Sequence, residues 1–418
     1  MNKRIALISD HASPLAEPGG VDSGGQNIYV CQLATILAGR GHRVDVFTRR
    51  ADASPRIVER RGYRVIHIPA GPPRPVPKEE LLGWMPRFGD EIIAFMREEE
   101  AAYDLVHAHF WMSGMVADRI REELGIPYVI TFHALGIIRR NHQGSADRFP
   151  AERLEVERRL VQRADRIIAT CPGEFDELTT LYAAPPERIR VIPCGFDPDE
   201  MKPVPAGPAR KALGWRDDEF VVLHVGRIVP RKGIDNLIRG YSRWQRGSGA
   251  RVRARLVIVG GETRRPDPER HPEFRRLSKV AAEEGCAESI TFLGRRSRME
   301  LPALYSAADL FVTTPLYEPF GITPLEAMAC GVPVIAADVG GLRFSVVHRK
   351  TGLLVPPGDP SELAENIQWL HENPDQRERF SHQARMRAGE CFRWSLLIAR
   401  IERVYLELGV FQRNPSLA

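Results

Sequence analysis

Short apolar runs alternate along almost the whole chain with longer amphipathic stretches, and this alternation limits the folds that the chain can adopt. Such a pattern is typical of βαβ units, in which right-handed crossovers place helices on both faces of a buried parallel sheet. In the first half we expect strands at residues 4–9, 43–48, 64–68, 105–107, 128–132, 166–170 and 189–192. In the second half we expect them at residues 220–225, 256–259, 289–293, 310–313, 332–336 and 352–355. The sequence therefore predicts an α/β fold.

A proline-rich connection separates the two series of strands, with prolines at 198, 203, 205 and 208. Proline stiffens a connection, and 418 residues suffice for two domains of about 100–200 residues each. We expect an N-terminal domain at residues 1–200, a second domain at 201–390, and a C-terminal helix within 391–418 that crosses back to the first. Ligands of doubly wound sheets bind outside the carboxyl ends of the strands. Two such domains would face each other across a cleft.

Composition excludes several classes of protein. Lys and Arg number 59 against 54 Asp and Glu, an excess too diffuse to indicate a nucleic-acid binder. The six cysteines form no CxxC pair, which argues against a zinc ribbon or a disulfide framework. The first apolar run is too short for a signal peptide, and no run of about 18 apolar residues occurs. We expect a cytoplasmic protein, with peripheral membrane contact or a homodimer left open.

A glycine-rich loop precedes the first helix, with glycines at 19, 20, 24 and 25 and the helix at about 27–38. Glycines at a helix N-terminus let a phosphate approach the backbone N–H groups. The alternative is a merely flexible connection. Neither GxGxxG after a strand nor a P-loop occurs, which argues against a dinucleotide oxidoreductase or a P-loop kinase.

Two cations follow the first strand of the second domain. Arg227 and Lys232 lie between Gly226 and Gly233, on a loop where they could clamp a diphosphate. The alternative is a solvated surface loop.

The segment 317–331 follows the strand predicted at 310–313 and carries two carboxylates, Glu318 and Glu326. Thr323 suits a helix N-cap and Pro324 a first helical position, which predicts a second anion site there. Glu326 would lie in the first turn and could simply complement the helix dipole. Glu318 and Glu326 could instead hold two polyol rings of one ligand.

These motifs together resemble the retaining glycosyltransferases of family 4 over nearly the full length of the chain. The carrying residues are 19–27, 107–111, 131–136, 191–197, 226–233 and the Glu318/Glu326 pair with seven residues between them. The resemblance implies the GT-B fold, which consists of two tandem Rossmann-like doubly wound domains. The similar enzymes include sucrose-phosphate synthases, mannosylfructose-phosphate synthases and the inositol-phosphate glycosyltransferases.

The resemblance also implies roles for individual residues. Arg227 and Lys232 would neutralise a nucleotide diphosphate, Glu326 would hold the ribose, and Glu318 would hold the donor sugar. His133 would contact that sugar next to its anomeric carbon; a hydrogen-bonded structural histidine is the alternative. The remaining donor contacts are expected from Gly24, Gly25, Gln26, Arg295, Phe320, Gly321, Ile322 and Thr323.

Acceptor contacts are implied for Asn27, Lys78 and Arg153. Phe110 and Ala134 stand where relatives that bind an acceptor phosphate carry Tyr and Thr. Losing two hydroxyl donors would cost about 1–3 kcal/mol each, which argues against an identical phosphate site. Arg139 and Arg140 could bind a phosphate differently or could be solvated.

We therefore expect a hexosyltransferase that uses a nucleoside diphosphate sugar, with UDP favoured, and a small sugar, polyol or sugar-phosphate acceptor. No cofactor or metal is expected, because the cations would stabilise the leaving diphosphate, and His107 and His109 have no third ligand in view. The Asp197/Asp199 pair matches a metal motif of another fold but lies in the linker. A lipid-linked or exopolysaccharide acceptor, a nucleotide-sugar 2-epimerase and a non-catalytic binding module remain alternatives.

Overall fold

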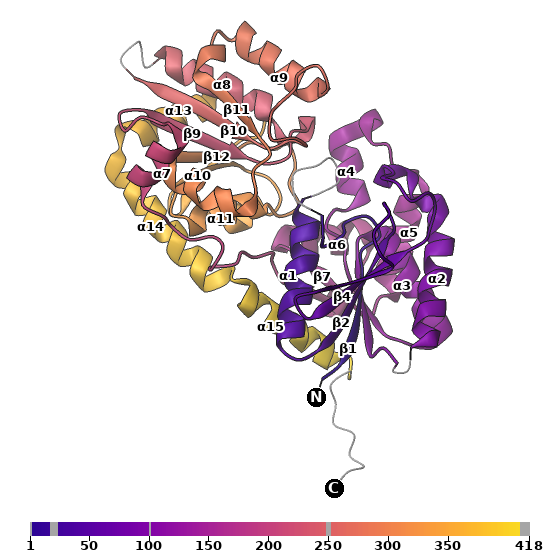
Figure 1. Cartoon of the computed structure of the whole chain (residues 1–418). Coiled ribbons are helices and arrows are strands. Elements are labelled where there is room, and N and C mark those ends of the chain that lie inside the picture. Colours follow the sequence, from indigo (N-terminus) through magenta and orange to yellow (C-terminus); the bar gives the residue numbers. More distant parts are fainter. Residues whose placement is uncertain (1, 17–23, 100–101, 248–251, 410–418) are drawn as a thin grey trace. The chain divides into compact units, whose positions relative to one another are not determined.

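The computed structural model describes residues 2–16, 24–99, 102–247 and 252–409. They form two compact units, which are described separately (Figure 1). The first unit comprises the chain up to Pro193 together with the segment from Trp394 onward, and the second comprises Cys194–Arg393.

The described part of the first unit holds an eight-stranded sheet in the order β3-β4-β2-β1-β5-β6-β7-β8. Its strands are β1 (Arg4–Ile8), β2 (Arg43–Arg49), β3 (Ile57–Arg60), β4 (Tyr63–Ile68), β5 (Leu105–His109), β6 (Tyr128–Thr131), β7 (Arg166–Ala169) and β8 (Ile189–Val191). Its helices are α1 (Gly25–Gly39), α2 (Met85–Glu98), α3 (Trp111–Leu124), α4 (Gly136–Gln143), α5 (Glu152–Arg163), α6 (Pro172–Tyr182) and α15 (Trp394–Glu407), with 3₁₀ turns η1 (Lys78–Glu80), η2 (Leu82–Trp84), η3 (Gly144–Ala146) and η4 (Pro186–Arg188). In Figure 1, α1 and α15 lie on one side of this sheet, and α2 and α3 lie on the other.

One strand of the first unit escaped the sequence prediction. β3 pairs with β4 in the antiparallel direction, whereas the other pairs of this sheet are parallel. Arg61 and Gly62 join the two strands with φ angles of 48° and 84°, as in a two-residue hairpin turn. β3 carries largely exposed residues at the sheet edge, so no continuous apolar run marks it.

The second unit holds a parallel sheet in the order β11-β10-β9-β12-β13-β14. Its strands are β9 (Phe220–Val225), β10 (Ala254–Val259), β11 (Ile290–Gly294), β12 (Leu310–Thr313), β13 (Val334–Ala337) and β14 (Gly352–Val355). Its helices are α7 (Ala206–Leu213), α8 (Ile234–Gly247), α9 (Pro272–Glu283), α10 (Leu301–Ala307), α11 (Ile322–Ala329), α12 (Leu342–Ser345), α13 (Pro360–Glu372) and α14 (Pro374–Cys391), with 3₁₀ turns η5 (Pro230–Lys232), η7 (Ala287–Ser289) and η8 (Arg298–Glu300). The remaining strand predictions are confirmed to within a few residues, and the fold class is confirmed.

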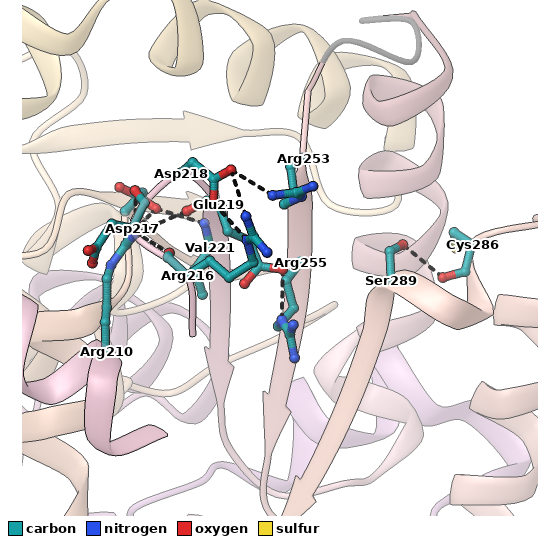
Figure 2. A network of polar contacts seen from close by, with 11 residues as sticks. Arg210, Arg216, Asp217, Asp218, Glu219, Val221, Arg253, Arg255, Cys286 and Ser289 are labelled. Atoms are coloured by element: carbon teal, nitrogen blue, oxygen red, sulfur yellow. Dashed lines mark hydrogen bonds and ion pairs between the residues drawn. The ribbon is translucent and has the colours of Figure 1, made fainter. Parts of the chain in front are cut away.

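The amino ends of β9 and β12 are fastened by Arg210 of α7. Its guanidinium donates to the backbone carbonyls of Arg216, Asp217 and Glu219 at 3.0–3.3 Å (Figure 2). It also pairs with Asp309 at 2.6 Å, and the same carboxylate accepts the N–H of Val221 at 2.7 Å. Arg210 thus ties the start of β9 to the start of β12. These starts lie at the end of the strands opposite the loops that follow them.

The last described helix, α15, packs against α1 of the first unit. The rings of Trp394 and Tyr29 meet edge to face with centroids 5.3 Å apart. Farther along, Arg40 pairs with Glu402, and the hydroxyl of Tyr405 lies 2.8 Å from Nδ1 of His107. None of the described helices is long and apolar enough to cross a membrane.

In each sheet the chain adds strands first towards one edge and then, from a neighbouring central strand, towards the other edge. In the first unit this switch lies between β1 and β5, and in the second it lies between β9 and β12. Loops that follow such strand pairs line the ligand sites of doubly wound sheets. The candidate site residues named from the sequence follow β1, β4, β5, β6, β9, β11 and β12.

Candidate functional site

In the second unit, the loops that follow β9 and β12 are bonded to each other. Leu316 N–H donates to the carbonyl of Arg231, and the hydroxyl of Thr314 donates to the carbonyl of Gly233, both at 2.9 Å. Gly233 has a φ of 62°, and a Cβ there would lie 2.0 Å from the carbonyl oxygen of Thr314. Only glycine fits this approach, which fixes the backbone next to Lys232.

The two loops bring three cations to one carboxylate. Lys232 forms an ion pair with Glu318, and Nη1 of Arg231 lies 3.7 Å from the same carboxylate. Burial would raise the pKa of Glu318, but Lys232, Arg231 and Arg227 hold it below its usual value. Burial lowers the pKa of Lys232, and repulsion from Arg231 and Arg227 adds to this effect. The cluster carries an excess of positive charge, which an anion would relieve.

Glu318 is held by a third loop, which the sequence reading missed. Its carbonyl accepts the N–H of Gly341 at 3.1 Å. A Cβ at Gly340, which has a φ of 43°, would lie 2.0 Å from that carbonyl oxygen. The available signal was the pair Gly340 and Gly341, which is separated from the end of β13 by two residues, since glycines after a buried strand often mark a close backbone approach.

Helix α11 begins earlier than the sequence suggested. Its N-cap is Gly321, with a φ of 89°, and its first residue is Ile322. Thr323 therefore lies within the first turn and is not the N-cap, and Pro324 occupies the third position rather than the first. Proline is tolerated there because the N–H groups of the first turn have no partner within the helix.

Glu326 is the fifth residue of α11, so the expectation that it lies in the first turn is wrong. Its side chain is 1% exposed and accepts from Arg298 Nη1 at 2.7 Å and from the hydroxyl of Tyr305 at 3.1 Å. Burial opposes the charge of Arg298, but Glu326 and Glu200 raise its pKa above the usual value. Glu326 belongs to a buried ion-pair network, which the helix-dipole interpretation does not describe.

The other residues predicted to contact the donor lie elsewhere in the second unit or in the first unit. Arg295 follows β11, and its N–H donates to the carbonyl of Thr263 at 2.7 Å. Phe320 is buried with its ring edge-on to Phe392, Ile322 is buried, and Thr323 is half-buried. Residues 19–23 of the predicted phosphate loop lie outside the described residues.

In the first unit, side chains at the start of α1 hold the neighbouring loops. The amide of Asn27 accepts the N–H of Gly24 and donates to the carbonyl of Ser13, both at 2.9 Å. Gln26 donates to the carbonyl of His109 at 3.3 Å. Gly24 and Gly25 thus begin a helix whose first turn is bonded to the loop after β1 and to the last residue of β5.

His133 follows β6 and stands against a second histidine. Its backbone has a φ of 60°, a left-handed conformation that is uncommon outside glycine and asparagine. Its Nε2 lies 3.1 Å from Nδ1 of His109. Burial lowers the pKa of His133 to about 3. The imidazole is therefore neutral at ordinary pH.

His107 is a structural residue of the strand end. Its Nε2 lies 2.9 Å from the hydroxyl of Thr131, and its Nδ1 contacts Tyr405. Both ring nitrogens are thus engaged in hydrogen bonds. Its ring packs against that of His109 with centroids 4.4 Å apart and planes tilted by 32°, and His133 follows on the other side of that contact, so the three rings form a column of imidazoles.

Three of the predicted acceptor residues are brought together around Arg153. This guanidinium is buried and pairs with Glu157 at 2.7 Å, and its Nη2 donates to the carbonyl of Ala134 at 2.6 Å. It lies 5.0 Å from the ring centroid of Phe110 and 4.6 Å from that of Phe149. The acceptor candidates Phe110 and Ala134 thus flank a cation that already has a carboxylate partner.

Lys78 and Arg139 share the carboxylate of Glu79 and are also paired. Lys78 pairs with Glu79 at 3.1 Å, and Arg139 pairs with Asp147 at 2.8 Å and with Glu79 at 3.3 Å. Arg139 lies over the ring of Phe149, whereas Arg140 is exposed.

The sequence reading missed Glu157 and Phe149. Glu157 could have been found from its i,i+4 spacing to Arg153 on a predicted helix. We call Lys78, Arg139 and Arg153, together with Glu79, Asp147 and Glu157, the charge-balanced cluster. Two of its cations, Arg139 and Arg153, lie over the Phe149 ring.

Comparisons with known proteins identify the family to which the chain belongs. Residues 23–200 match the family model described as Glycosyltransferase Family 4, and residues 207–387 match the one described as Glycosyl transferases group 1. A D-inositol 3-phosphate glycosyltransferase of Actinosynnema mirum is 38% identical over 392 residues, which are 91% of this chain and 92% of that protein.

Solved structures extend the likeness to the whole fold. Sucrose-phosphate synthase from Thermosynechococcus elongatus aligns with a TM-score of 0.90 and 35% identity, covering 98% of this chain and 100% of that one. Anabaena HepE, solved in complex with UDP and glucose, aligns with a TM-score of 0.77 and 22% identity over 97% of this chain and all of that one. The chain thus belongs to glycosyltransferase family 4 and is a glycosyltransferase with the GT-B fold.

Proposed function

We propose that the protein transfers a hexose from a nucleoside diphosphate sugar, with UDP as the nucleotide to test first, to a hydroxyl of a small polyol or sugar, with retention of configuration and without a metal ion. The observation that carries the donor half is the cluster of Arg227, Arg231 and Lys232 around Glu318.

The charge of this cluster suits a diphosphate. Three cations share one carboxylate, so a bound dianion would bring the group close to neutrality. When the diphosphate binds, we expect it to take over Lys232, which frees Glu318 to accept hydrogen bonds from hydroxyls of the transferred sugar. The ion pair of the unliganded protein thus keeps Glu318 charged and placed until the donor arrives.

The proposed step breaks the bond between the anomeric carbon and the diphosphate oxygen. An acceptor hydroxyl oxygen bonds to the anomeric carbon on the face that the diphosphate leaves, and the departing phosphate oxygen takes the hydroxyl proton. Negative charge grows on the diphosphate, where Arg227, Arg231 and Lys232 stabilise it. Charge-assisted hydrogen bonds of about 1.5–3 kcal/mol each support the expectation that no divalent ion is required.

The acceptor half of the proposal rests on the charge-balanced cluster of the first unit. Lys78, Arg139 and Arg153 all have carboxylate partners, so an additional phosphate would have to displace one of them. The rings of Phe110 and Phe149 are buried and lie against the Arg153 guanidinium, so this cation is enclosed as well as paired. These features favour an uncharged, hydroxylated acceptor, although the similar proteins include inositol-phosphate glycosyltransferases and a sucrose-phosphate synthase.

Nucleoside diphosphate release is the direct test. UDP- and GDP-hexoses would be supplied in EDTA with separate pools of free polyols and sugars, sugar phosphates, and lipid-linked acceptors. We expect release that depends on the pool of free polyols and sugars, and an NMR spectrum of the product that shows the donor's anomeric configuration. Release only after a divalent ion is added would contradict the metal-free mechanism, and release only with sugar phosphates would contradict the uncharged acceptor.

A further inference from the structure

The column of imidazoles contains one contact whose direction matters. Nδ1 of His109 lies 3.1 Å from Nε2 of His133. A neutral imidazole carries a single N–H, so one of these nitrogens donates and the other accepts. Whichever arrangement holds decides which nitrogen of His133 carries its proton.

Both rings are neutral. Burial lowers the pKa of His109 well below 6.5, and proximity to His107 and His133 adds to this effect. Burial likewise lowers the pKa of His133 to about 3. At pH 7 the pair therefore shares two protons, one for each ring, and two tautomeric arrangements are open to it.

The surroundings of His109 choose between the two arrangements. Its Nε2 is buried and has no hydrogen-bond partner among the described residues. A proton on Nε2 would bury an N–H without an acceptor, which is rarer in proteins than a lone pair without a donor. The Tyr29 ring beside it, edge to face at 5.5 Å, offers an N–H at most a weak contact. The proton of His109 is thus better placed on Nδ1, where it donates to His133.

We propose that His109 is a positioning residue: its Nδ1–H donates to Nε2 of His133 and so fixes the proton of His133 on Nδ1, from which His133 donates to an oxygen of the bound sugar. The second half rests on the proposed function. Nδ1 of His133 makes no hydrogen bond within the described part of the chain, and the residue is half-buried rather than sealed. Its left-handed backbone shows that the surrounding structure holds it in a costly conformation.

The remaining contacts of the column keep His109 in place. The His107 ring packs against it with centroids 4.4 Å apart, and His107 is itself fixed by Thr131 and Tyr405. Tyr405 is therefore a matched control, because it supports the same column without touching His133.

The first experiment measures the tautomers by NMR on histidine-labelled protein at pH 7.5. His224 supplies an internal reference, because its Nδ1 lies 2.9 Å from the carbonyl of Val312, which can only accept, so His224 must carry its proton on Nδ1. We expect His133 to show the same nitrogen and carbon shifts as this Nδ1–H form. A His133 signal typical of Nε2–H would overturn the proposal, whatever reaction the protein catalyses.

The second experiment compares variants of nearly equal shape. His109→Leu removes the donor, and His109→Asn places an amide N–H near the position of Nδ1. We expect His109→Leu to shift His133 towards a mixture of tautomers and to lower kcat about tenfold, the effect of losing one oriented hydrogen bond in the transition state. His109→Asn should restore the Nδ1–H signal and most of kcat, and the dissociation constant for UDP should stay unchanged in both.

Tyr405→Phe completes the design. It should lower the melting temperature as a core change does, with the His133 tautomer and kcat preserved. Equal kcat in His109→Leu and wild type would overturn the positioning role, and so would a loss in Tyr405→Phe as large as that in His109→Leu. If the wild-type protein turned over no donor, the proposed function would fail, whereas the tautomer measurement would still decide the role of His109.

Discussion

Lys232 and Glu318 follow the neighbouring strands β9 and β12 and form an ion pair whose side chains are only 13% and 11% exposed. Arg231 and Arg227 leave this pair with excess positive charge. A diphosphate would therefore compete for Lys232 with a carboxylate that its neighbours already keep ionised.

Replacing Lys232 tests this competition. Lys232→Met keeps the length of the side chain and removes the charge that would stabilise the leaving group. We expect kcat to fall about 10²–10³-fold, the usual effect of losing one preorganised charge in the transition state. Lys350→Met, which changes an exposed lysine, is the control. Comparable turnover in the two variants would remove Lys232 from the mechanism.

The nucleotide site is tested at Glu326. Glu326→Gln leaves the Tyr305 contact possible but removes the charge that Arg298 meets at 2.7 Å. If Glu326 also holds the ribose, the affinity for UDP measured by calorimetry should fall about tenfold, or about 1.4 kcal/mol. Arg298→Met separates the roles, since it disrupts the network while keeping the carboxylate. Undiminished UDP affinity in Glu326→Gln would mean that the carboxylate serves only Arg298 and Tyr305.

Arg210 should matter for stability and not for binding. Arg210→Met leaves Asp309 and several backbone carbonyls without their donor. We therefore expect the free energy of unfolding of the second unit, measured in urea, to fall by about 2–4 kcal/mol. At a temperature where the variant is still folded, its UDP affinity should equal that of the wild type. A changed UDP affinity would show that the Arg210 contacts at the starts of β9 and β12 affect the loops that follow these strands.

The buried histidines predict an acid-sensitive fold. His107 and His133 have folded pKa values of about 3 against an ordinary 6.5, so below pH 6.5 the unfolded chain binds protons that the folded protein does not. The free energy of unfolding should therefore be independent of these histidines above pH 6.5. It should fall as the pH drops towards 3, by up to about 1.4 kcal/mol per pH unit for each histidine. Urea titrations between pH 4 and 7.5 measure this slope. His107→Gln should flatten it, and an unchanged slope would contradict the assignment.

Acceptor choice can be tested by adding the missing hydroxyls. The double variant Phe110→Tyr and Ala134→Thr supplies the side chains that relatives with an acceptor phosphate carry. We expect inositol phosphate not to stimulate donor consumption by the wild-type protein and to do so measurably in the double variant. Efficient use of inositol phosphate by the wild type would contradict the uncharged acceptor and would mean that a phosphate displaces a carboxylate of the charge-balanced cluster.

The elements that could be predicted are those with a continuous local signal. β9 and β12 are short runs that are apolar apart from His224 and Thr313, and the Glu318/Glu326 spacing carries the resemblance to the family. β3 was missed because an exposed edge strand needs no apolar run, and the start of α11 was displaced because the positive φ of Gly321 lets the helix begin before Thr323.

The partners of the site residues are set by the tertiary structure alone. Arg298 and Tyr305 come to Glu326 from segments with no motif, and Glu157 reaches Arg153 and the N–H of Gly136 in the interior of the first unit. The sequence could therefore indicate which side chains are functional candidates. It could not show that the acceptor cations are already neutralised.

The return of α15 to the first unit has a consequence for synthesis of the chain. The second unit is one continuous segment, Cys194–Arg393, inserted between two parts of the first. His107 and Tyr405 are hydrogen-bonded although they stand 298 positions apart. On the ribosome the inserted unit can fold as it emerges, whereas the packing of the first unit is complete only after α15 has left the exit tunnel. The half of the protein that is translated first is therefore completed last, and its partly covered sheet is the surface that a nascent chain exposes for longest.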